Sequence, residues 1–156
     1  MEQSLIDLIG ENNMDMFKYI REGLNLKEID AGEYSPLTLA YIGDCAYEIV
    51  VRTIVVDEHN QQTQKLHKKV SEYVKATTQA QMIFLIMDEL TEMETKMYKR
   101  GRNAKAVTRA KNASMSDYRQ ATGFEALMGW LFLSDQSDRM LELIKLSIDK
   151  YNENKQ

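Results

Sequence analysis

The spacing of apolar residues predicts a chain built from helices. In residues 78–87, for example, four apolar side chains recur at helical intervals. No stretch alternates apolar and polar residues convincingly enough to indicate a strand. The β-branched run at residues 49–56 continues a pattern that begins at Leu37 without any turn signal, so we read it as helix. The expected fold class is therefore all-α.

Capping residues, glycine and proline divide this pattern into segments. Ser35 followed by Pro36 is typical of a helix start, and Gly23 is expected to end the first segment, which bends near residues 10–13. The segment around Gly101 is expected to be a loop with room for one helical turn. Fraying is expected at residues 152–156. The predicted helices cover residues 4–22, 36–58, 61–77, 78–87, 88–100, 116–134 and 135–151.

Length and composition narrow the class of protein. The 156 residues suit one domain that buries its own core. The single cysteine, Cys45, excludes an internal disulfide, and only His59 and His67 are available for a Cys/His zinc site. No run approaches the roughly 20 apolar residues of a membrane helix, and the N-terminus does not read as a secretory signal. We expect a cytoplasmic protein without a membrane partner.

The charges are unevenly distributed along the chain. The formal net charge is −4, yet residues 95–116 contain seven basic residues and no acid. The remaining residues carry 13 basic against 24 acidic side chains, a net charge of −11. This asymmetry predicts a local basic surface on an acidic body.

Two carboxylates stand inside otherwise apolar helical runs. Asp44 follows a mostly apolar stretch that begins at Leu37, and Glu125 lies in the apolar run 123–133. A carboxylate in such surroundings costs free energy unless a cation or hydrogen-bond donors satisfy it, and one Mg²⁺ would satisfy both acids. Gly43 removes a side chain beside Asp44, which would allow a neighbouring element to approach closely.

Structural explanations of these acids stay open from the residues alone. Asp44 and Glu48, one turn apart, would also suit a solvated helix face. Glu125 could form a structural ion pair with one of three basic residues, namely Arg52, Arg119 or Lys105.

The acid-free basic segment mixes positive side chains with residues that suit a loop. Arginine matches phosphate in a bidentate manner, and glycine lets the backbone come close. A solvated charge run, a membrane surface or an acidic protein partner would use the same charges, although no strong apolar face accompanies them. The candidate phosphate-binding residues are Lys99, Arg100, Arg102, Asn103 and Lys105, together with His67 and Lys68 of the third predicted helix.

Four motifs occur in an order that resembles ribonuclease III catalytic domains. They are residues 37–48 (LTLAYIGDCAYE), 66–76 (LHKKVSEYVKA) with Gln79 and Ala80, 99–105 (KRGRNAK) and 118–129 (YRQATGFEALMG). Together they resemble the Mini-ribonuclease III branch, which lacks a double-stranded-RNA-binding domain. The resemblance covers about residues 26–151. We therefore divide the chain into an N-terminal helical extension, residues 1–25, and a catalytic domain, residues 26–156.

The resemblance implies an all-helical, homodimeric endoribonuclease that uses Mg²⁺ to cut double-stranded RNA. The implied products carry a 5′-phosphate and a 3′-hydroxyl. In this reading Asp44 and Glu125 are the catalytic Mg²⁺ ligands, the basic residues bind RNA, and Tyr41 lies near the dimer interface. The family's usual substrate is precursor 23S ribosomal RNA, with a bound ribosomal protein as a further expected partner.

The chain departs from the larger ribonuclease III enzymes at two positions. Where those enzymes carry two further acids, this chain has Ala40 and Thr122, a reduction that the Mini branch shares. Fewer ligands leave water or RNA phosphates to complete the metal shell. The alternatives are a non-catalytic duplex-RNA-binding relative and a ribosome-associated helical adaptor. Neither requires Asp44 and Glu125 in apolar runs, so the sequence favours the enzyme.

Overall fold

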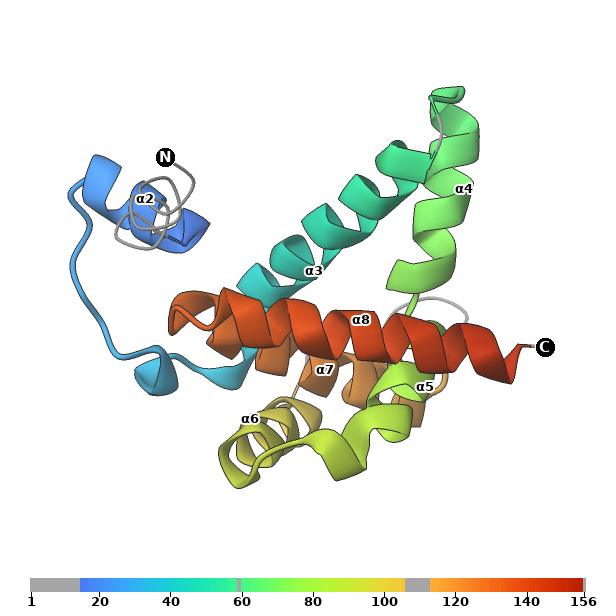
Figure 1. The fold of residues 1–156 in the computed structure, drawn as a ribbon. Coiled ribbons are helices and arrows are strands. Elements are labelled where there is room, and N and C mark those ends of the chain that lie inside the picture. The colour runs from blue at the N-terminus through green and yellow to red at the C-terminus, as the bar shows by residue number, and fades with distance from the viewer. Residues whose placement is uncertain (1–14, 59, 106–112, 156) are drawn as a thin grey trace, which may run out of the picture.

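The computed structural model describes residues 15–58, 60–105 and 113–155, and none of these residues forms a strand. The fold is all-helical, as predicted (Figure 1). In chain order the elements are α2 (Met16–Gly23), the 3₁₀ turn η1 (Ala31–Glu33), α3 (Pro36–Glu58), α4 (Thr63–Val74), α5 (Ala76–Ile86), the 3₁₀ turn η2 (Met87–Glu89), α6 (Glu92–Arg102), α7 (Met115–Leu133) and α8 (Ser137–Asn154).

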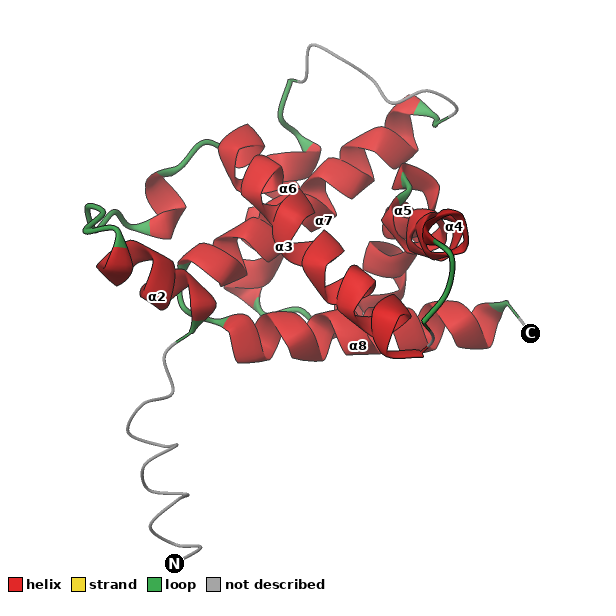
Figure 2. Ribbon diagram, turned by 90° about the horizontal axis from the view of Figure 1, so that it is seen from above, coloured by secondary structure: helices red, strands yellow, loops and turns green. Residues whose placement is uncertain are grey.

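Helix α7 forms the centre of the bundle. It packs against α3, α5, α6 and α8, which surround it in the views of Figures 1 and 2. Its middle is apolar except at Glu125, with Phe124, Leu127, Met128 and Leu131 fully buried. Each neighbouring helix therefore covers a different face of α7, and a side chain on α7 is held by contacts from several elements.

The predicted start of α3 is confirmed by its cap. The Ser35 hydroxyl accepts a hydrogen bond from the Thr38 amide at 3.1 Å, and Pro36 occupies the first helical position. The helix then runs to Glu58, so the β-branched stretch is helical as expected. This long helix carries Asp44 near its middle.

The loop predicted around Gly101 is wrong. Gly101 is buried inside the last turn of α6, where a β-carbon would lie 2.6 Å from the Ala126 β-carbon and 2.8 Å from the Gly123 α-carbon. The glycine therefore serves close packing of α6 on α7 and not a turn. The basic segment begins on a helix, and residues 106–112 lie outside the described part.

Other boundaries also differ from the prediction. Lys75 adopts an extended conformation and separates α4 from α5 earlier than expected. Thr91 caps α6, so that helix begins at Glu92 and not at residue 88. Helix α8 continues to Asn154 where fraying was predicted, because the Tyr73 hydroxyl donates a hydrogen bond to Asn152 at 3.1 Å. Of the first predicted helix, residues 4–14 lie outside the described residues.

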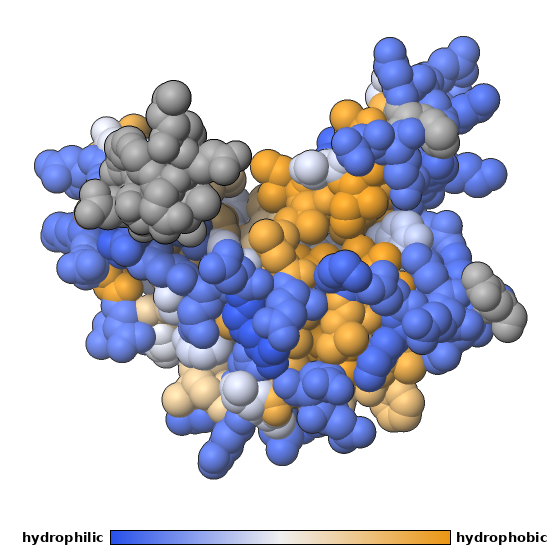
Figure 3. Space-filling view, in the orientation of Figure 1, coloured by the Kyte–Doolittle hydropathy of each residue, from blue (hydrophilic) through white to orange (hydrophobic). Residues whose placement is uncertain are grey.

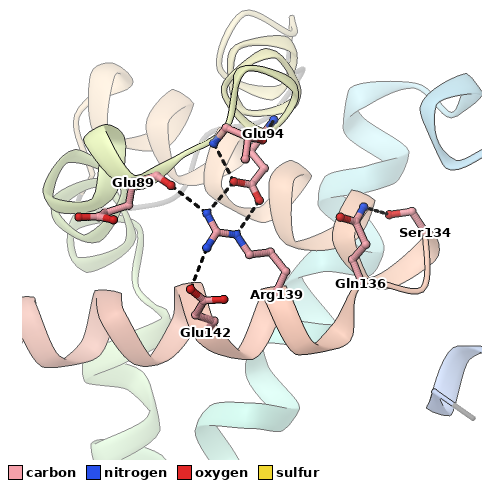
Figure 4. Close-up of polar contacts among 7 residues, drawn as sticks. Glu89, Glu94, Ser134, Gln136, Arg139 and Glu142 are labelled. Carbon is pink, nitrogen blue, oxygen red and sulfur yellow. Dashed lines mark hydrogen bonds and ion pairs between the residues drawn. The ribbon is translucent and has the colours of Figure 1, made fainter. Parts of the chain in front are cut away.

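A buried ion pair joins the start of α6 to α8 (Figure 4). Glu94 is almost fully buried and accepts two hydrogen bonds of 2.9 Å from the Arg139 guanidinium, while its backbone and carboxylate complete a capping box with Thr91. Burial acts to raise the pKa of Glu94, but the bonds from Arg139 and Thr91 outweigh it and lower the pKa. Arg139 also donates to the Glu89 carbonyl at 2.8 Å. The pair fixes the N-terminal end of α6.

Helix α2 packs on the corner between α7 and α8. The Phe17 ring lies 5.5 Å from the Phe132 ring, and Lys18 pairs with Asp135 at 3.9 Å. This is the described part of the predicted extension, residues 1–25, and the division of the chain at residue 25 stays a prediction. Among the described helices, none is both long enough and apolar enough to cross a membrane.

Candidate active site

Two glycines bring α3 and α7 into backbone contact. A β-carbon on Gly43 would overlap the carbonyl oxygen of Glu125, and one on Gly129 would overlap the carbonyl oxygen of Leu39. The expectation that Gly43 permits close approach is confirmed, and its partner is α7. The crossing places Asp44, the residue after Gly43, next to Glu125.

The two carboxylates of this crossing influence each other. Burial is the main cause that raises the pKa of Glu125, to about 8, and the nearby charge of Asp44 raises it as well. The pKa of Asp44 is also raised, by partial burial and then by the charge of Glu48. Two acids are thus held together in a setting that disfavours their ionisation, as in sites that bind a cation.

No basic side chain pairs with either acid within the described ranges. Arg52, one of the partners considered for Glu125, pairs with Glu48 at 3.3 Å instead. Arg119 and Lys105 are exposed and form no ion pair with Glu125 among the described residues. The structural ion pair is therefore not what holds Glu125 in the core.

An open cleft of about 770 Å³ contains both carboxylates. Tyr41 lies at its edge, and Ala40 and Thr122, the positions where the larger enzymes carry acids, line the same cleft. The remaining lining residues are Leu37, Val74, Lys75, Ala76, Thr77, Ala113, Tyr118, Ala121 and the two acids themselves. The two acids, the two positions of the missing acids and Tyr41, all singled out by the resemblance, thus share one cavity.

The start of α5 also lines this cleft, a feature that sequence reasoning missed. Lys75 precedes the helix, and Ala76 and Thr77 form its first turn. A helix N-terminus with a lysine favours an anion electrostatically. The sequence signal for this feature is a basic residue between two helical patterns. It can be recognised only when the break between the two helices is placed at Lys75.

The predicted RNA-binding residues lie outside the cleft and divide into two groups. Lys99, Arg102 and Asn103 lie at the end of α6, and Lys105 follows it. A separate groove of about 780 Å³ runs along α6 and includes Lys96, Lys99, Arg100 and Asn103. The second group, His67 and Lys68, is exposed on α4.

Arg100 has structural contacts that its position in a basic run did not reveal. Its guanidinium donates to the carbonyl oxygens of Gly32 at 3.1 Å and Tyr34 at 2.9 Å. These bonds tie the last turns of α6 to the segment that leads into α3. Arg102 stacks over the Tyr98 ring, with 5.5 Å from its Cζ to the ring centroid, and its Nε donates to Asn103.

Comparison with known proteins identifies the family. The sequence model of the ribonuclease III domain matches residues 37–136, which span both carboxylates and the basic end of α6. The chain belongs to the ribonuclease III family. Membership makes it an endoribonuclease.

The curated relatives belong to one branch of this family. Mini-ribonuclease 3 of Clostridium tetani is 47% identical over 128 residues, which cover 81% of this chain and 85% of that protein. Mini-ribonuclease 3 of Enterococcus faecalis is 46% identical and is covered over 96% of its length, against 80% of this chain. A crystal structure of a Fusobacterium nucleatum protein matches with a TM-score of 0.70 and 27% identity, covering 79% of this chain and 98% of that one.

The raised pKa of Glu125 predicts how stability of the metal-free ribonuclease III domain depends on pH. The folded chain retains a proton on Glu125 up to about pH 8, whereas the unfolded chain releases it near the ordinary pKa of 4.5. Between these values the folded state binds more protons, so its stability falls as pH rises, by at most about 1.4 kcal/mol per pH unit.

Urea unfolding in EDTA at pH 5 and pH 8 measures this effect, with Glu125→Gln as the comparison. The glutamine carries no charge at either pH, so the variant is expected to gain stability relative to wild type as pH rises. Parallel pH profiles of the two proteins would show that Glu125 titrates normally.

Proposed function

We propose that the chain cleaves double-stranded RNA by Mg²⁺-dependent phosphodiester hydrolysis, with Asp44 and Glu125 as the metal ligands. The observation that carries the proposal is the meeting of these two carboxylates in one cleft, without a basic partner among the described residues. Membership of the ribonuclease III family supports the same reaction. The products expected are a 5′-phosphate and a 3′-hydroxyl.

The donor set of the cleft fits a hard cation. Carboxylate oxygens are preferred ligands of Mg²⁺, which usually retains several waters and shares substrate phosphates. Within the described ranges no cluster of three or more acidic, histidine or cysteine side chains could hold a metal. Ala40 and Thr122 supply no acidic ligand beside the two carboxylates. The site therefore suits an ion whose remaining ligands are water and phosphate.

The residues of the cleft would divide the chemistry among themselves. A bound Mg²⁺ supplies an activated water and neutralises charge on the phosphate and the departing oxygen. Asp44 and Glu125 would hold the cation in the cleft. Lys75 and the first turn of α5 lie where they can contact the negative RNA backbone. This arrangement supports a proposed anion-binding side of the cleft beside the two acids.

Duplex affinity is proposed to come from the basic residues beyond the cleft. Lys99, Arg100, Arg102, Asn103 and Lys105 at the end of α6, with His67 and Lys68 on α4, are our candidates. The groove along α6 and the exposure of the α4 residues support them. Since A-form RNA is recognised by shape and by phosphate and 2′-hydroxyl contacts, we expect little sequence dependence from these residues.

We further propose that two copies pair through α3. An exposed apolar stripe follows one face of this helix, formed by Leu37, Tyr41, Cys45 and Ile49 at successive helical turns, with Val56 two turns further on. Tyr41 is 78% exposed, an unusual state for a large aromatic ring. In the view of Figure 3 apolar surface gathers over α3, where the molecule is hollowed. A stripe on one helix suits a two-fold contact with itself.

Ile49→Asp is expected to convert the dimer into a monomer, because two charges would face each other across the apolar contact. Light scattering after gel filtration at micromolar concentration measures the mass. The matched control is Leu141→Asp on α8, whose side chain is exposed to nearly the same extent, 47% against 50% for Ile49. A wild-type monomer, or an Ile49→Asp dimer, would contradict the proposed interface.

For the biological substrate we propose precursor 23S ribosomal RNA in the cytoplasm, with a ribosomal protein bound to it as a second partner. The similarity to Mini-ribonuclease 3 proteins supports this choice.

The test of the reaction is incubation of the purified chain with a duplex RNA, with Mg²⁺ or with EDTA. Duplex binding without cleavage at any divalent metal concentration would indicate a non-catalytic relative. Failure to bind duplex RNA at low salt would indicate a helical adaptor.

A further inference from the structure

Gln79 is a buried polar side chain without a hydrogen-bond partner. It lies in the first part of α5, is 0% exposed, and neither its amide nitrogen nor its amide oxygen is bonded to any described residue. The other buried polar side chains are satisfied. Thr78, the preceding residue, donates to the Glu72 carbonyl at 2.6 Å, and Ser147 donates to the Leu143 carbonyl at 2.7 Å. Gln79 is the exception within the described chain.

A buried amide with no partner is unfavourable, and in native proteins such groups usually have a reason. Met82 and Ile83 on the same helix are fully buried, and the Met82 sulfur already accepts a hydrogen bond from the Tyr47 hydroxyl at 3.4 Å. The acidic group beside it is Glu125 on α7, against which α5 packs. The Gln79 amide lies close enough to lower the pKa of that carboxyl as a hydrogen bond does, although the contact does not have the geometry of a formed hydrogen bond. The amide is therefore next to the acid that faces the cleft.

We propose that Gln79 is a positioning residue of the active site, whose amide nitrogen donates to the Glu125 carboxylate and fixes its orientation toward Asp44. The inference rests on the proposed metal-ligand role of the two acids. A ligating carboxylate normally has such a supporting hydrogen bond on the side away from the ion. Gln79 is the group on the core side of Glu125 that can supply it.

The chemistry of an amide suits this position better than that of a basic residue. A lysine or arginine would also donate to Glu125, but its positive charge would repel a divalent cation a few ångströms away. A leucine or methionine would fill the space and leave the carboxylate free to rotate. Glutamine alone among these combines a hydrogen-bond donor with no net charge, so it can orient the acid without competing for it.

Gln79→Leu and Gln79→Met test the proposal because both keep the volume and remove the donor. Calorimetric titration with Mn²⁺ or Mg²⁺ in the absence of RNA is expected to show an affinity about 10- to 100-fold below wild type. In the duplex cleavage assay kcat is expected to fall while KM for RNA stays unchanged. The melting temperature is expected to stay equal or rise, because an unsatisfied amide has been replaced by an apolar group.

Ser147→Ala on α8, outside the cleft, is the matched control. It removes a satisfied buried hydroxyl, so its melting temperature is expected to fall while its metal affinity and kcat stay at the wild-type level. A merely structural Gln79 would behave as Ser147 does. Wild-type metal affinity in a folded Gln79→Leu or Gln79→Met, or failure of both variants to fold, would overturn the positioning role.

Asp44→Asn separates this inference from the function on which it rests. If Asp44→Asn binds metal and cleaves RNA as wild type does, the proposed metal site itself is wrong. If Asp44→Asn loses metal binding and cleavage but the Gln79 variants do not, only the role of Gln79 is wrong.

Discussion

Glu125→Gln is expected to reduce cleavage of duplex RNA by at least about a thousandfold while leaving the fold intact. The amide has nearly the same shape but lacks the charge that would hold a divalent cation, whose contribution to the transition state amounts to several kcal/mol. Asp44→Asn is expected to have an effect of similar size, because each variant leaves only one of the two carboxylates in the cleft.

Duplex binding and stability distinguish this outcome from damage to the fold. The basic groups on α6 and α4 lie outside the cleft, so a gel-shift assay in Ca²⁺ or EDTA is expected to show nearly wild-type affinity for both variants. Asp149→Asn, which removes an exposed carboxylate of α8 paired with Lys145, is the control and is expected to cleave normally. Cleavage at the wild-type rate by Glu125→Gln or by Asp44→Asn would refute the site assignment.

Gly43→Ala is expected to destabilise the chain by more than about 4 kcal/mol, although alanine is the better helix former by about 1 kcal/mol. The added methyl group would overlap the Glu125 carbonyl and lie 2.6 Å from the Gly129 amide nitrogen. These are backbone atoms of a central helix and cannot move aside as a side chain could. Separation of α3 from α7 would open the core at its centre.

Gly23→Ala is the matched control, since a β-carbon on Gly23 would meet no atom of another part of the described chain within 4 Å. Urea unfolding followed by circular dichroism is expected to place this variant within about 1 kcal/mol of wild type. Gly43→Ala is expected to be largely unfolded or to show a much lower midpoint. A midpoint close to wild type would mean that α3 and α7 are not in backbone contact at this position.

The periodic and chemically unusual features of the sequence were sufficient to predict much of the fold and the two acids. Asp44 and Glu125 could be found because charge in an apolar run is unfavourable without a partner, a property of each segment alone. The start of α3 was predictable from Ser35 and Pro36, whose effect is local. Gly43 beside an acid already indicated close approach of another element.

Features that depend on distant pairing could not be predicted in this way. Gly101 was read as a loop because a glycine in a basic run looks the same whether it turns the chain or packs on Gly123. The pair of Glu94 with Arg139 joins residues 45 positions apart, and the contacts of Arg100 with Gly32 and Tyr34 join residues even further apart. Nothing in the local pattern of Gln79 shows that its amide lacks a partner.

The crossing at Gly43 and Gly129 limits where evolution can alter this enzyme. The spacing of the two acids is set by main-chain atoms in contact, so no exchange of side chains at the crossing can widen or narrow it gradually. Change must instead occur at positions with free volume around the acids, such as Ala40 and Thr122, which face the same cleft. The backbone contact thus fixes the position of the proposed catalytic acids and leaves the number of proposed ligands as the adjustable property.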